Sequence, residues 1–343
     1  MKGGFLMQER YSRQVLFSGI GEMGQRKIRE KHVLLIGAGA LGAANAEALA
    51  RMGIGKLTIA DRDYVEWSNL QRQQLYTEED AKQCKPKAIA AAEHVRKINS
   101  EVEIVPVVTD VTMKEMEELT KEVDLILDAT DNFDTRLLIN DISQKENIPW
   151  IYGGCIGSYG VTYTILPGKT PCFRCLMDHP MGGATCDTAG IIQPAVQMVV
   201  AHQVTEAMKI LVDDYESLRG TMLSFDIWNN QYLSLKVNRQ KKSTCPSCGK
   251  SRTYPSLIFE AQMKTEVLCG RNTVQIRSGI KRDLNLNEIQ KRLQKSVHVQ
   301  KTPYLLSFLI DEYRFVLFTD GRAFIHGTND VKIAKRLYAK YIG

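Results

Sequence analysis

Short apolar runs alternate with segments of helical periodicity along the first half of the chain. The apolar runs predict β-strands over residues 33–36, 57–60, 103–108, 123–130 and 150–153. The intervening segments place apolar side chains three and four positions apart, and they predict helices over residues 43–52, 88–99, 114–120 and 135–147. Strands that alternate with helices favour a mainly parallel sheet with right-handed crossovers.

A different pattern follows the parallel strands. Apolar and polar residues alternate over residues 160–166, which predicts antiparallel strands, and strand-like segments return over residues 223–237. Between them lies a long apolar helix over residues 191–212. We therefore expect residues 1–253 to form one α/β domain, in which a Rossmann-like, mainly parallel sheet continues into antiparallel strands.

Tyr254 and Pro255 mark the start of a second, smaller domain, residues 254–343. The segments of strand character lie at residues 267–276, 305–310, 313–319 and 323–326, and the helical ones at residues 286–293 and 329–341. Asp320 and Gly321 are typical of a hairpin turn. This part of the chain predicts a small accessory α+β domain.

The first predicted strand runs directly into a glycine-rich turn. Gly37, Gly39 and Gly42 fit the pattern G-x-G-x-x-G, in which the glycines allow a tight turn, close approach of a phosphate and close packing of helix on strand. The second strand runs into Asp61, an acid placed to accept hydrogen bonds from a ribose. The pattern predicts a nucleotide site. On the glycines alone, a nicotinamide dehydrogenase is the leading interpretation.

Polar residues collect where the predicted parallel strands end. Residues 63–74 are too polar and irregular for a strand, and they follow the carboxyl end of one, where open α/β sheets bind ligands. The set contains two cations, two acids and an amide, namely Arg72, Lys87, Asp61, Asp131 and Asn69. Cations that spread phosphate charge and a carboxylate that holds Mg²⁺ suit nucleotidyl transfer, whereas hydride transfer needs no such cations.

Two C-x-x-C pairs give the strongest metal signal, Cys172 with Cys175 and Cys245 with Cys248. Four thiolates in two close pairs are typical of a closed, tetrahedral, structural zinc site. A redox-active dithiol is the alternative for a single pair, but neither pair lies at a strand–helix junction of thioredoxin type. We therefore expect a zinc site that joins two distant segments.

Composition narrows the class of protein. Of the 343 residues, 44% are hydrophobic and 24% are charged, as in soluble globular proteins. The N-terminus lacks the apolar segment of a secretory signal, and no apolar run reaches the roughly 20 residues that span a bilayer. The net charge of +6 comes without a basic block that contains aromatic residues. We expect a cytoplasmic protein that binds neither nucleic acid nor membrane.

The order of these motifs resembles the ThiF/MoeB family, the bacterial relatives of ubiquitin-activating enzymes, over residues 8–250. Besides the glycine turn and the cysteine pairs, the resemblance is carried by residues 11–14 (YSRQ), 61–63 (DRD), 68–73 (SNLQRQ), 85–87 (KPK) and 128–132 (DATDN). It implies adenylation, with MgATP, of the C-terminal glycine of a ubiquitin-like sulfur carrier. That carrier would be of ThiS or MoaD type, which serve thiamine-thiazole and molybdopterin biosynthesis.

The resemblance also implies roles for the site residues. The nucleotide would lie on the glycine turn with its ribose at Asp61, and the further implied contacts are Asp63 to the nucleotide, Arg72 and Lys87 to the phosphates, Asp131 to Mg²⁺, and Asn69 and Gln73 to phosphate or metal. Arg13 would reach into the neighbouring subunit's site in a homodimer. Cys186 matches a loop cysteine that joins the carrier through an acyl-disulfide in the thiamine branch, with a persulfide donor such as a cysteine desulfurase.

Residues 254–343 depart from the short members of this family. Some relatives end in a rhodanese domain, but this tail is too short for one, and its Cys269 lies too early to match a rhodanese active loop. We expect an accessory role, such as docking of the carrier. Two alternatives to the sulfur-carrier adenylyltransferase stay open at this point: a nicotinamide oxidoreductase and a non-catalytic scaffold that binds carriers.

Overall fold

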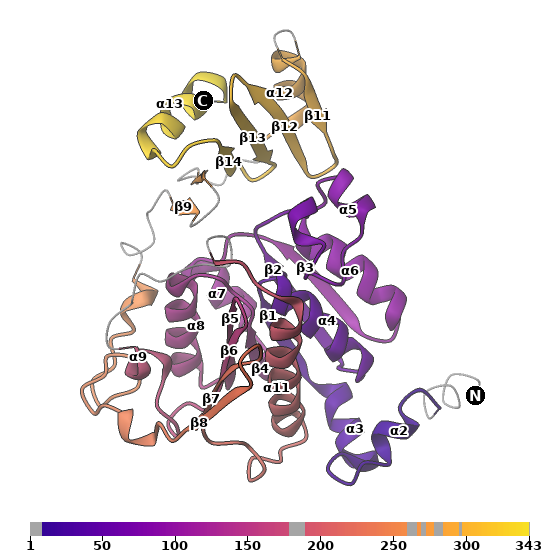
Figure 1. Cartoon of the computed structure of the whole chain (residues 1–343), viewed down its shortest axis with the longest axis vertical. Coiled ribbons are helices and arrows are strands. Elements are labelled where there is room, and N and C mark those ends of the chain that lie inside the picture. The colour runs from indigo at the N-terminus through magenta and orange to yellow at the C-terminus, as the bar shows by residue number, and fades with distance from the viewer. Residues whose placement is uncertain are drawn as a thin grey trace.

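The computed structural model describes residues 9–177, 189–258, 266–268, 272–277, 284–294 and 297–342. These residues form two separate sheets. Figure 1 shows the larger sheet with helices on both sides, and the smaller sheet at one end of the molecule. We call the part that contains the smaller sheet, from Glu266 onwards, the C-terminal unit.

The larger sheet has eight strands in the order β3-β2-β1-β4-β5-β6-β7-β8. Their bounds are β1 (His32–Ile36), β2 (Lys56–Asp61), β3 (Glu103–Val108), β4 (Leu125–Asp128), β5 (Trp150–Ile156), β6 (Tyr159–Ile165), β7 (Met222–Asp226) and β8 (Gln231–Leu235). Neighbours from β3 to β5 are parallel, and every pair from β5 to β8 is antiparallel. The expected fold class is confirmed, including the change from parallel to antiparallel pairing.

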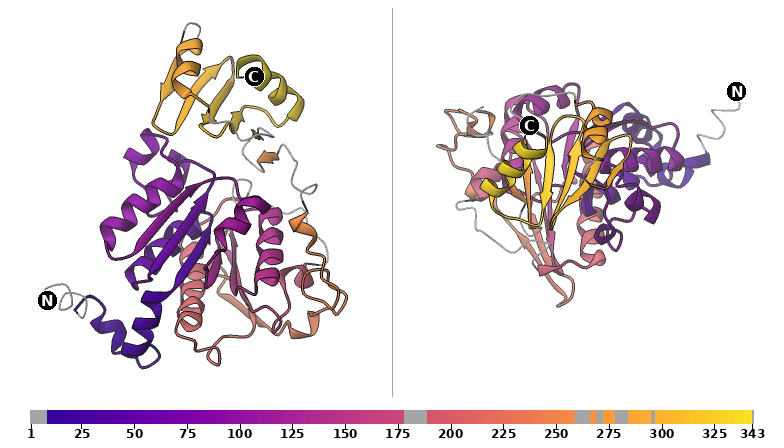
Figure 2. Two further views of the ribbon diagram at one scale, coloured as in Figure 1. Left: turned by 180° about the vertical axis from the view of Figure 1, so that it is seen from behind. Right: turned by 90° about the horizontal axis from the view of Figure 1, so that it is seen from above.

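Helices cover both faces of this sheet (Figures 1 and 2). They are α2 (Ser12–Val15), α3 (Gly21–Glu30), α4 (Ala40–Arg51), α5 (Glu78–Lys82), α6 (Lys87–Ile98), α7 (Met113–Leu119), α8 (Phe133–Glu146), α9 (Phe173–Leu176) and α11 (Gln193–Leu211), with 3₁₀ helices η1 (Trp67–Asn69), η2 (Asn238–Gln240) and η3 (Pro255–Leu257). Among the described residues, none of the helices combines the length and apolar character that a membrane span requires.

The side chains of β1 alternate between two hydrophobic cores. Val33 and Leu35 share a core with α4, α6 and α11, whereas Leu34 and Ile36 share the other core with α7 and α8. Because both faces of the strand are buried, β1 is a continuous apolar run and has no polar alternation. This is why the sequence pattern located the strand so closely.

The C-terminal unit is built on a six-stranded sheet in the order β11-β12-β13-β14-β10-β9. Its elements are β9 (Glu266–Leu268), β10 (Thr273–Ile276), α12 (Leu286–Leu293), β11 (Val299–Lys301), β12 (Leu305–Ile310), β13 (Tyr313–Phe318), β14 (Ala323–His326) and α13 (Val331–Tyr341). All the pairs in this sheet are antiparallel. Both helices pack into one core with the sheet.

The segment of residues 267–276 was predicted as one stretch of strand character, and this is wrong. It contains two strands, β9 and β10, which pair antiparallel with Leu268 opposite Thr273. Asn272 precedes β10 with a φ of 44°, the left-handed conformation that asparagine tolerates in turns. The three-residue β11 was missed, because so short a strand carries no periodicity.

The C-terminal unit contacts the carboxyl ends of β2 and β3. Arg322 donates from Nη1 to the carbonyl oxygen of Arg62 at 3.2 Å, just past β2. Arg277 forms an ion pair with Asp110, just past β3. Figure 1 shows the unit at this end of the sheet, near α5. The unit therefore lies at the edge where an open α/β sheet binds its ligands.

Candidate active site and metal centre

The glycine turn between β1 and α4 has room for a ligand at only one of its three glycines. At Gly37, with a φ of +94°, an added Cβ would lie 2.5 Å from the carbonyl oxygen of Ala129. At Gly42 it would lie 2.0 Å from the carbonyl oxygen of Gly37. At Gly39, by contrast, the nearest described atom would be the amide nitrogen of Gln73, at 4.0 Å. That opening suits the close approach of a phosphate to the backbone.

The start of α4 differs from its prediction. The helix was expected from residue 43 and begins at Ala40, so Gly42 lies within its first turn. The spacing of apolar residues could not reveal this earlier start, because Gly42 has no side chain to contribute to the pattern. Gly42 fits into the first turn of the helix because it has no Cβ to clash with Gly37. The free N–H groups of the first helical turn therefore belong to the glycine-rich segment itself, where they favour the binding of an anion.

Asp61 ends β2 beside this turn. Its carboxylate accepts hydrogen bonds from the backbone N–H groups of Ala38 and Asp63, each at 2.6 Å. Burial raises the pKa of Asp61, and the positive charge of Lys87 opposes that rise. Tyr76 donates its hydroxyl to the carbonyl oxygen of Ala38 at 2.6 Å. Asp61 thus lies where the sequence predicted and holds the turn in shape, while its contact with a ribose stays a prediction.

Lys87 is a buried cation, with only 2% of its surface exposed. Its Nζ lies 3.2 Å from Oδ2 of Asp63, and its backbone N–H donates to the carbonyl oxygen of Asp63 at 2.9 Å. Tyr64 and Pro86 form an isolated antiparallel bridge. The two short segments that carry Asp63 and Lys87 are therefore held side by side. An ammonium group has three donors, so Lys87 can bind a phosphate oxygen as well as this carboxylate.

The segment after Asp63 forms a 3₁₀ turn that presents amide side chains. Asn69 accepts a hydrogen bond at Oδ1 from the backbone N–H of Glu66 at 3.0 Å. The backbone N–H of Gln73 donates to the carbonyl oxygen of Asn69 at 2.9 Å. Gln73 is buried, and its Oε1 accepts no hydrogen bond from the described residues. Arg72 is partly exposed and donates to the carbonyl oxygen of Ser68 at 2.8 Å.

Asp131 lies on the loop that follows β4, and it is exposed. The next residue, Asn132, caps α8 by accepting a hydrogen bond from the backbone N–H of Thr135 at 2.8 Å. An exposed carboxylate beside a well-fixed helix start is able to take a hydrated cation such as Mg²⁺, which keeps several of its waters. Its binding of Mg²⁺ stays a prediction.

A buried ion pair that holds this loop was missed by sequence reasoning. Asp128 is fully buried, and its Oδ2 lies 3.2 Å from Nε of Arg136. Arg136 also donates to the carbonyl oxygen of Thr130 at 2.6 Å, and Gln203 donates to that of Asp128 at 2.8 Å. The available signal was an acid at the end of an otherwise apolar strand, which requires a partner when buried.

Arg13 lies on α2 and is exposed, whereas its neighbours Tyr11 and Gln14 are anchored to the rest of the chain. Tyr11 is buried, and its hydroxyl accepts a hydrogen bond from the side-chain amide of Asn99 at 2.8 Å. Gln14 donates to the carbonyl oxygen of Met52 at 2.9 Å. The anchored residues hold α2 against the domain and leave Arg13 directed to solvent, so its expected role in a neighbouring subunit's site stays a prediction.

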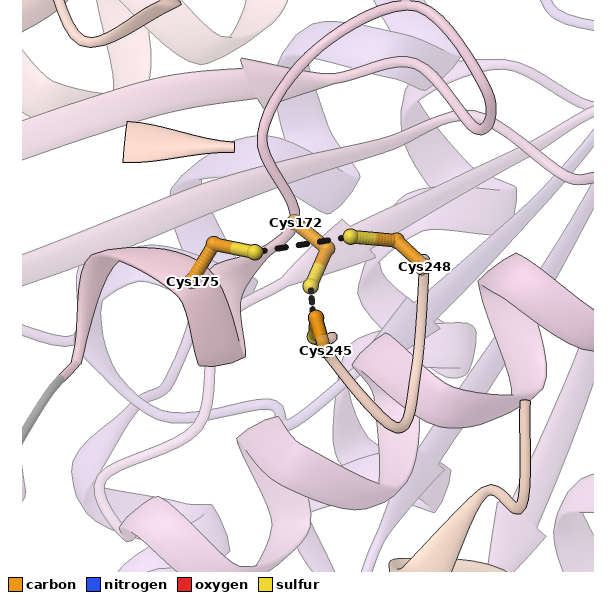
Figure 3. A group of neighbouring side chains, drawn as sticks. All are labelled: Cys172, Cys175, Cys245 and Cys248. Carbon is orange, nitrogen blue, oxygen red and sulfur yellow. Dashed lines mark hydrogen bonds between the residues drawn. The ribbon is translucent and has the colours of Figure 1, made fainter. Parts of the chain in front are cut away.

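The four predicted cysteines are brought together in one buried cluster (Figure 3). Their Sγ atoms all lie within 4.8 Å of one another, with 3.6 Å between Cys172 and Cys245 and 3.4 Å between Cys175 and Cys248. Tetrahedral zinc thiolates at about 2.3 Å from the metal have sulfur atoms about 3.8 Å apart, which matches this spread. The cluster can hold zinc.

The surroundings of the cluster also suit a cation. Burial raises the pKa of Cys172, and it raises that of Cys248 to about 11, so the thiolates need a compensating positive charge. Arg174 next to Cys175 forms an ion pair with the buried Asp141 at 3.2 Å. Such outer contacts hold ligand-bearing segments in place.

Cys186 and Cys269 lie outside the residues that the structure describes. The implied role of Cys186 therefore stays a prediction.

The open glycine turn and the buried Lys87 suit a nucleotide, and the family match together with the most similar relatives makes the chain an adenylyltransferase. The chain belongs to the ThiF family, whose model matches residues 11–247. It is 52% identical over 339 residues to the sulfur carrier protein ThiS adenylyltransferase of Bacillus subtilis, covering 98% of this chain and 100% of that one. The oxidoreductase and scaffold alternatives find no support in this relationship.

Shorter relatives match about seven-tenths of the chain. The SAMP-activating enzyme E1 of Haloferax volcanii is 37% identical over 71% of this chain and 89% of its own length. The ThiS adenylyltransferase of Escherichia coli is 36% identical over 72% of this chain and 97% of its own. The crystal structure of E. coli MccB with ATP has a TM-score of 0.61 at 23% identity, covering 70% and 74% of the two chains, and it supports the fold alone.

Proposed function

We propose that this enzyme uses MgATP to adenylate the C-terminal glycine of a ThiS-type sulfur carrier for the thiazole of thiamine. The observation that carries the proposal is the match, over nearly the whole chain, with the ThiS adenylyltransferase of Bacillus subtilis. That match covers 98% of the chain and so includes the C-terminal unit, whereas the shorter relatives match about seven-tenths of the chain. A MoaD-type carrier is the alternative substrate.

The reaction joins two anions, and the site supplies the opposing charge. A carboxylate oxygen of the carrier attacks the α-phosphorus of ATP, the bond from that phosphorus to the bridging oxygen breaks, and pyrophosphate leaves. Lys87 and Arg72 offset the phosphate charge, and Asp131 holds Mg²⁺. Fixed donors of this kind stabilise the charge that develops on the leaving group, and positioning supplies much of the remaining acceleration.

The other nucleotide contacts follow from the geometry of the turn. The phosphates lie over Gly39, where the opening is, and Gln73 faces them with its buried amide. Asn69 shares this role from the 3₁₀ turn, and Asp61 with Asp63 binds the nucleoside side of ATP. Support comes from the hydrogen bonds that hold Asp61 against the glycine turn at Ala38 and Asn69 in the 3₁₀ turn that follows Asp63.

The enzyme acts as a homodimer in which Arg13 completes the partner's site. Support comes from exposed apolar side chains close to Arg13: Leu16 is 73% and Phe17 is 64% exposed. Large apolar side chains grouped on a surface are typical of an interface. Arg13 is exposed on a helix that is anchored to its own subunit, which suits a role across that interface.

The cysteines have two separate roles, one in binding zinc and one in sulfur transfer. Zinc bound by the four cysteines is structural, because a closed set of four thiolates leaves no open position for chemistry. The thiolate of Cys186 takes the outer sulfur of a persulfide donor such as a cysteine desulfurase, and the donor cysteine leaves as a thiol. The resulting persulfide attacks the acyl-adenylate of the carrier, AMP leaves, and an acyl-disulfide forms. The match of residues 182–187 (GGATCD) to the cysteine-containing loop of the thiamine branch supports this assignment.

ATP–pyrophosphate exchange with purified carriers tests the proposal. We expect exchange with a ThiS-type carrier, and none with the same carrier lacking its terminal glycine. A MoaD-type carrier from the same organism serves as the comparison. If MoaD alone stimulates exchange, the thiamine assignment is wrong, and if neither carrier does, the sulfur-carrier function is wrong.

A further inference from the structure

The C-terminal unit packs on the segments that carry Asp63 and Lys87. A cluster of buried side chains joins the two parts: Tyr64 and Cys84 come from the segments of the active site, and Leu305, Val316, Phe318 and Phe324 come from the C-terminal sheet. Tyr64 directly follows Asp63, and Cys84 precedes Lys87 by three positions. The apolar contact is therefore made at the nucleotide-binding segments themselves.

Tyr64 is the centre of the polar contacts across this junction. Its side chain is nearly buried, and its hydroxyl donates to Oε1 of Glu66 at 3.1 Å. Two groups of the C-terminal unit reach the same oxygen: Nη2 of Arg314 at 3.2 Å and Nε2 of His326 at 3.0 Å. Thr273 contacts the other ring nitrogen of His326 at 2.8 Å, which fits a ring that carries its proton on Nε2.

The contact continues from Tyr64 to a residue of the site. Glu66 and Asn69 form a reciprocal capping box at the 3₁₀ turn, in which each side chain meets the backbone of the other. The carboxylate of Glu66 therefore accepts one hydrogen bond from the hydroxyl of Tyr64 and another from the backbone N–H of Asn69 in the turn. His326, Tyr64, Glu66 and Asn69 form one chain of hydrogen bonds that runs from the C-terminal unit to the site.

Two separate contacts hold the backbone on either side. Arg322 donates to the carbonyl oxygen of Arg62, so the residues before and after Asp63 are both held by the C-terminal unit. Gln300 donates to the carbonyl oxygen of Lys82 at 3.3 Å, on the segment that leads to Lys87. The site segments are joined to each other by one isolated bridge and by the ion pair of Asp63 with Lys87, so contacts from the C-terminal unit also help to fix their geometry.

We propose that the C-terminal unit positions the ATP-binding segments, with His326, Arg314 and Arg322 as positioning residues for nucleotide binding and adenylate formation. The residues touch no nucleotide themselves; they act through Tyr64 and the backbone around Asp63. The inference uses the adenylyltransferase chemistry of the enzyme, and it does not depend on which carrier is the substrate.

Full-length point variants test the proposal. His326→Ala removes the donor to Tyr64, whereas His326→Gln keeps an amide N–H near the position of Nε2. Tyr64→Phe removes the hydroxyl but keeps the ring in the apolar cluster. Tyr338→Phe is the matched control, because its hydroxyl donates to the carbonyl oxygen of Gly321 within the C-terminal unit.

Three measurements are made on each variant: MgATP binding by calorimetry, kcat and KM for ATP in pyrophosphate exchange with a carrier, and thermal melting. We expect Tyr64→Phe and His326→Ala to weaken MgATP binding and to lower kcat/KM by about tenfold, since small displacements of binding groups are costly. His326→Gln should recover most of the loss. Tyr338→Phe should behave as the wild type.

The outcomes separate positioning from simple attachment. Variants that melt at a lower temperature but bind MgATP and turn over as the wild type at 25 °C would overturn the proposal. A glutamine variant no better than the alanine variant would remove His326 from the role. A wild type that binds MgATP but shows no exchange with any carrier would contradict the proposed function only, because the binding data would still test the positioning.

Discussion

Asp63 and Lys87 illustrate how a single ion pair serves both the fold and the site. Removing one member of a buried pair leaves the other charge uncompensated, at a cost of about 3–5 kcal/mol. A Lys87 variant would therefore combine a loss of stability with any loss of phosphate binding. Asp131 differs, because it is exposed and forms no ion pair with the described residues, so its removal leaves no buried charge without a partner. It is the better residue at which to separate chemistry from folding.

We predict that Asp131→Ala lowers carrier-dependent pyrophosphate exchange by at least about 100-fold, the effect expected when a charge-stabilising group is lost. The melting temperature should change little, because exposed substitutions usually fall within about 0.5 kcal/mol. Asp134→Ala, at an exposed acid in the first turn of α8, is the matched control. Exchange that survives at near wild-type rate would remove Asp131 from the magnesium role.

At the scale of the element, β1, the glycine turn and α4 act as one unit. The strand ends at Ile36, Gly37 packs closely against the carbonyl oxygen of Ala129, and the helix begins at Ala40. Two glycines are needed for packing and the third for open space. This division separates positions that stabilise the fold from the position that admits the ligand.

We predict opposite results at two of these glycines. Gly42→Ala places a methyl group against the carbonyl oxygen of Gly37, and we expect it to destabilise the domain by about 1–3 kcal/mol or more, the usual cost of overpacking. Gly39→Ala should lower the melting temperature less than Gly42→Ala does, because the space around the added methyl group is open. It should nevertheless weaken MgATP binding, since the methyl group fills that space. Calorimetry and thermal melting on both variants check the prediction, and equal melting temperatures would contradict it.

Local patterns were enough to predict the elements that are continuous apolar runs or have a regular helical repeat. β1, β3 and α12 were located from apolar runs and helical spacing, and the cysteine pairs were found from their spacing. The pairing of β9 with β10 was missed because a turn at Asn272 interrupts a short apolar stretch. The contact of Tyr64 with His326 could not be predicted, since the two residues are 262 positions apart and neither carries a motif.

At the scale of the whole molecule, the segment around α2 and the start of α3 offers apolar surface that a second copy could cover. Leu16, Phe17 and Met23 are each at least 64% exposed, and burying them would remove apolar surface from water. Arg13 lies on the same part of the chain. A dimer formed here would therefore serve both burial and catalysis.

We predict that Arg13→Ala and Arg72→Ala are each inactive alone, and that mixing them restores activity. A heterodimer would contain one site with both arginines, so activity should return to about one quarter of wild type after statistical exchange of subunits. Pyrophosphate exchange before and after mixing is the measurement, and mass spectrometry verifies that subunits have exchanged. No recovery after verified exchange would show that Arg13 does not act across the interface.

The cysteine cluster also has a consequence for the order of folding. Cys172 and Cys245 are 73 positions apart, and closing so long a loop in an unfolded chain costs about 4 kcal/mol of entropy. Because the pairing of β6, β7 and β8 links the chain just before Cys172 to the chain just before Cys245, we expect this pairing to bring the two cysteine segments together first, and the metal to bind to a chain whose sheet has already formed. We expect refolding in the presence of a chelator to stop at a species that binds MgATP but melts at a lower temperature than the zinc-bound protein. Addition of zinc should then restore the melting temperature. A chain that cannot form its sheet without zinc would contradict this order.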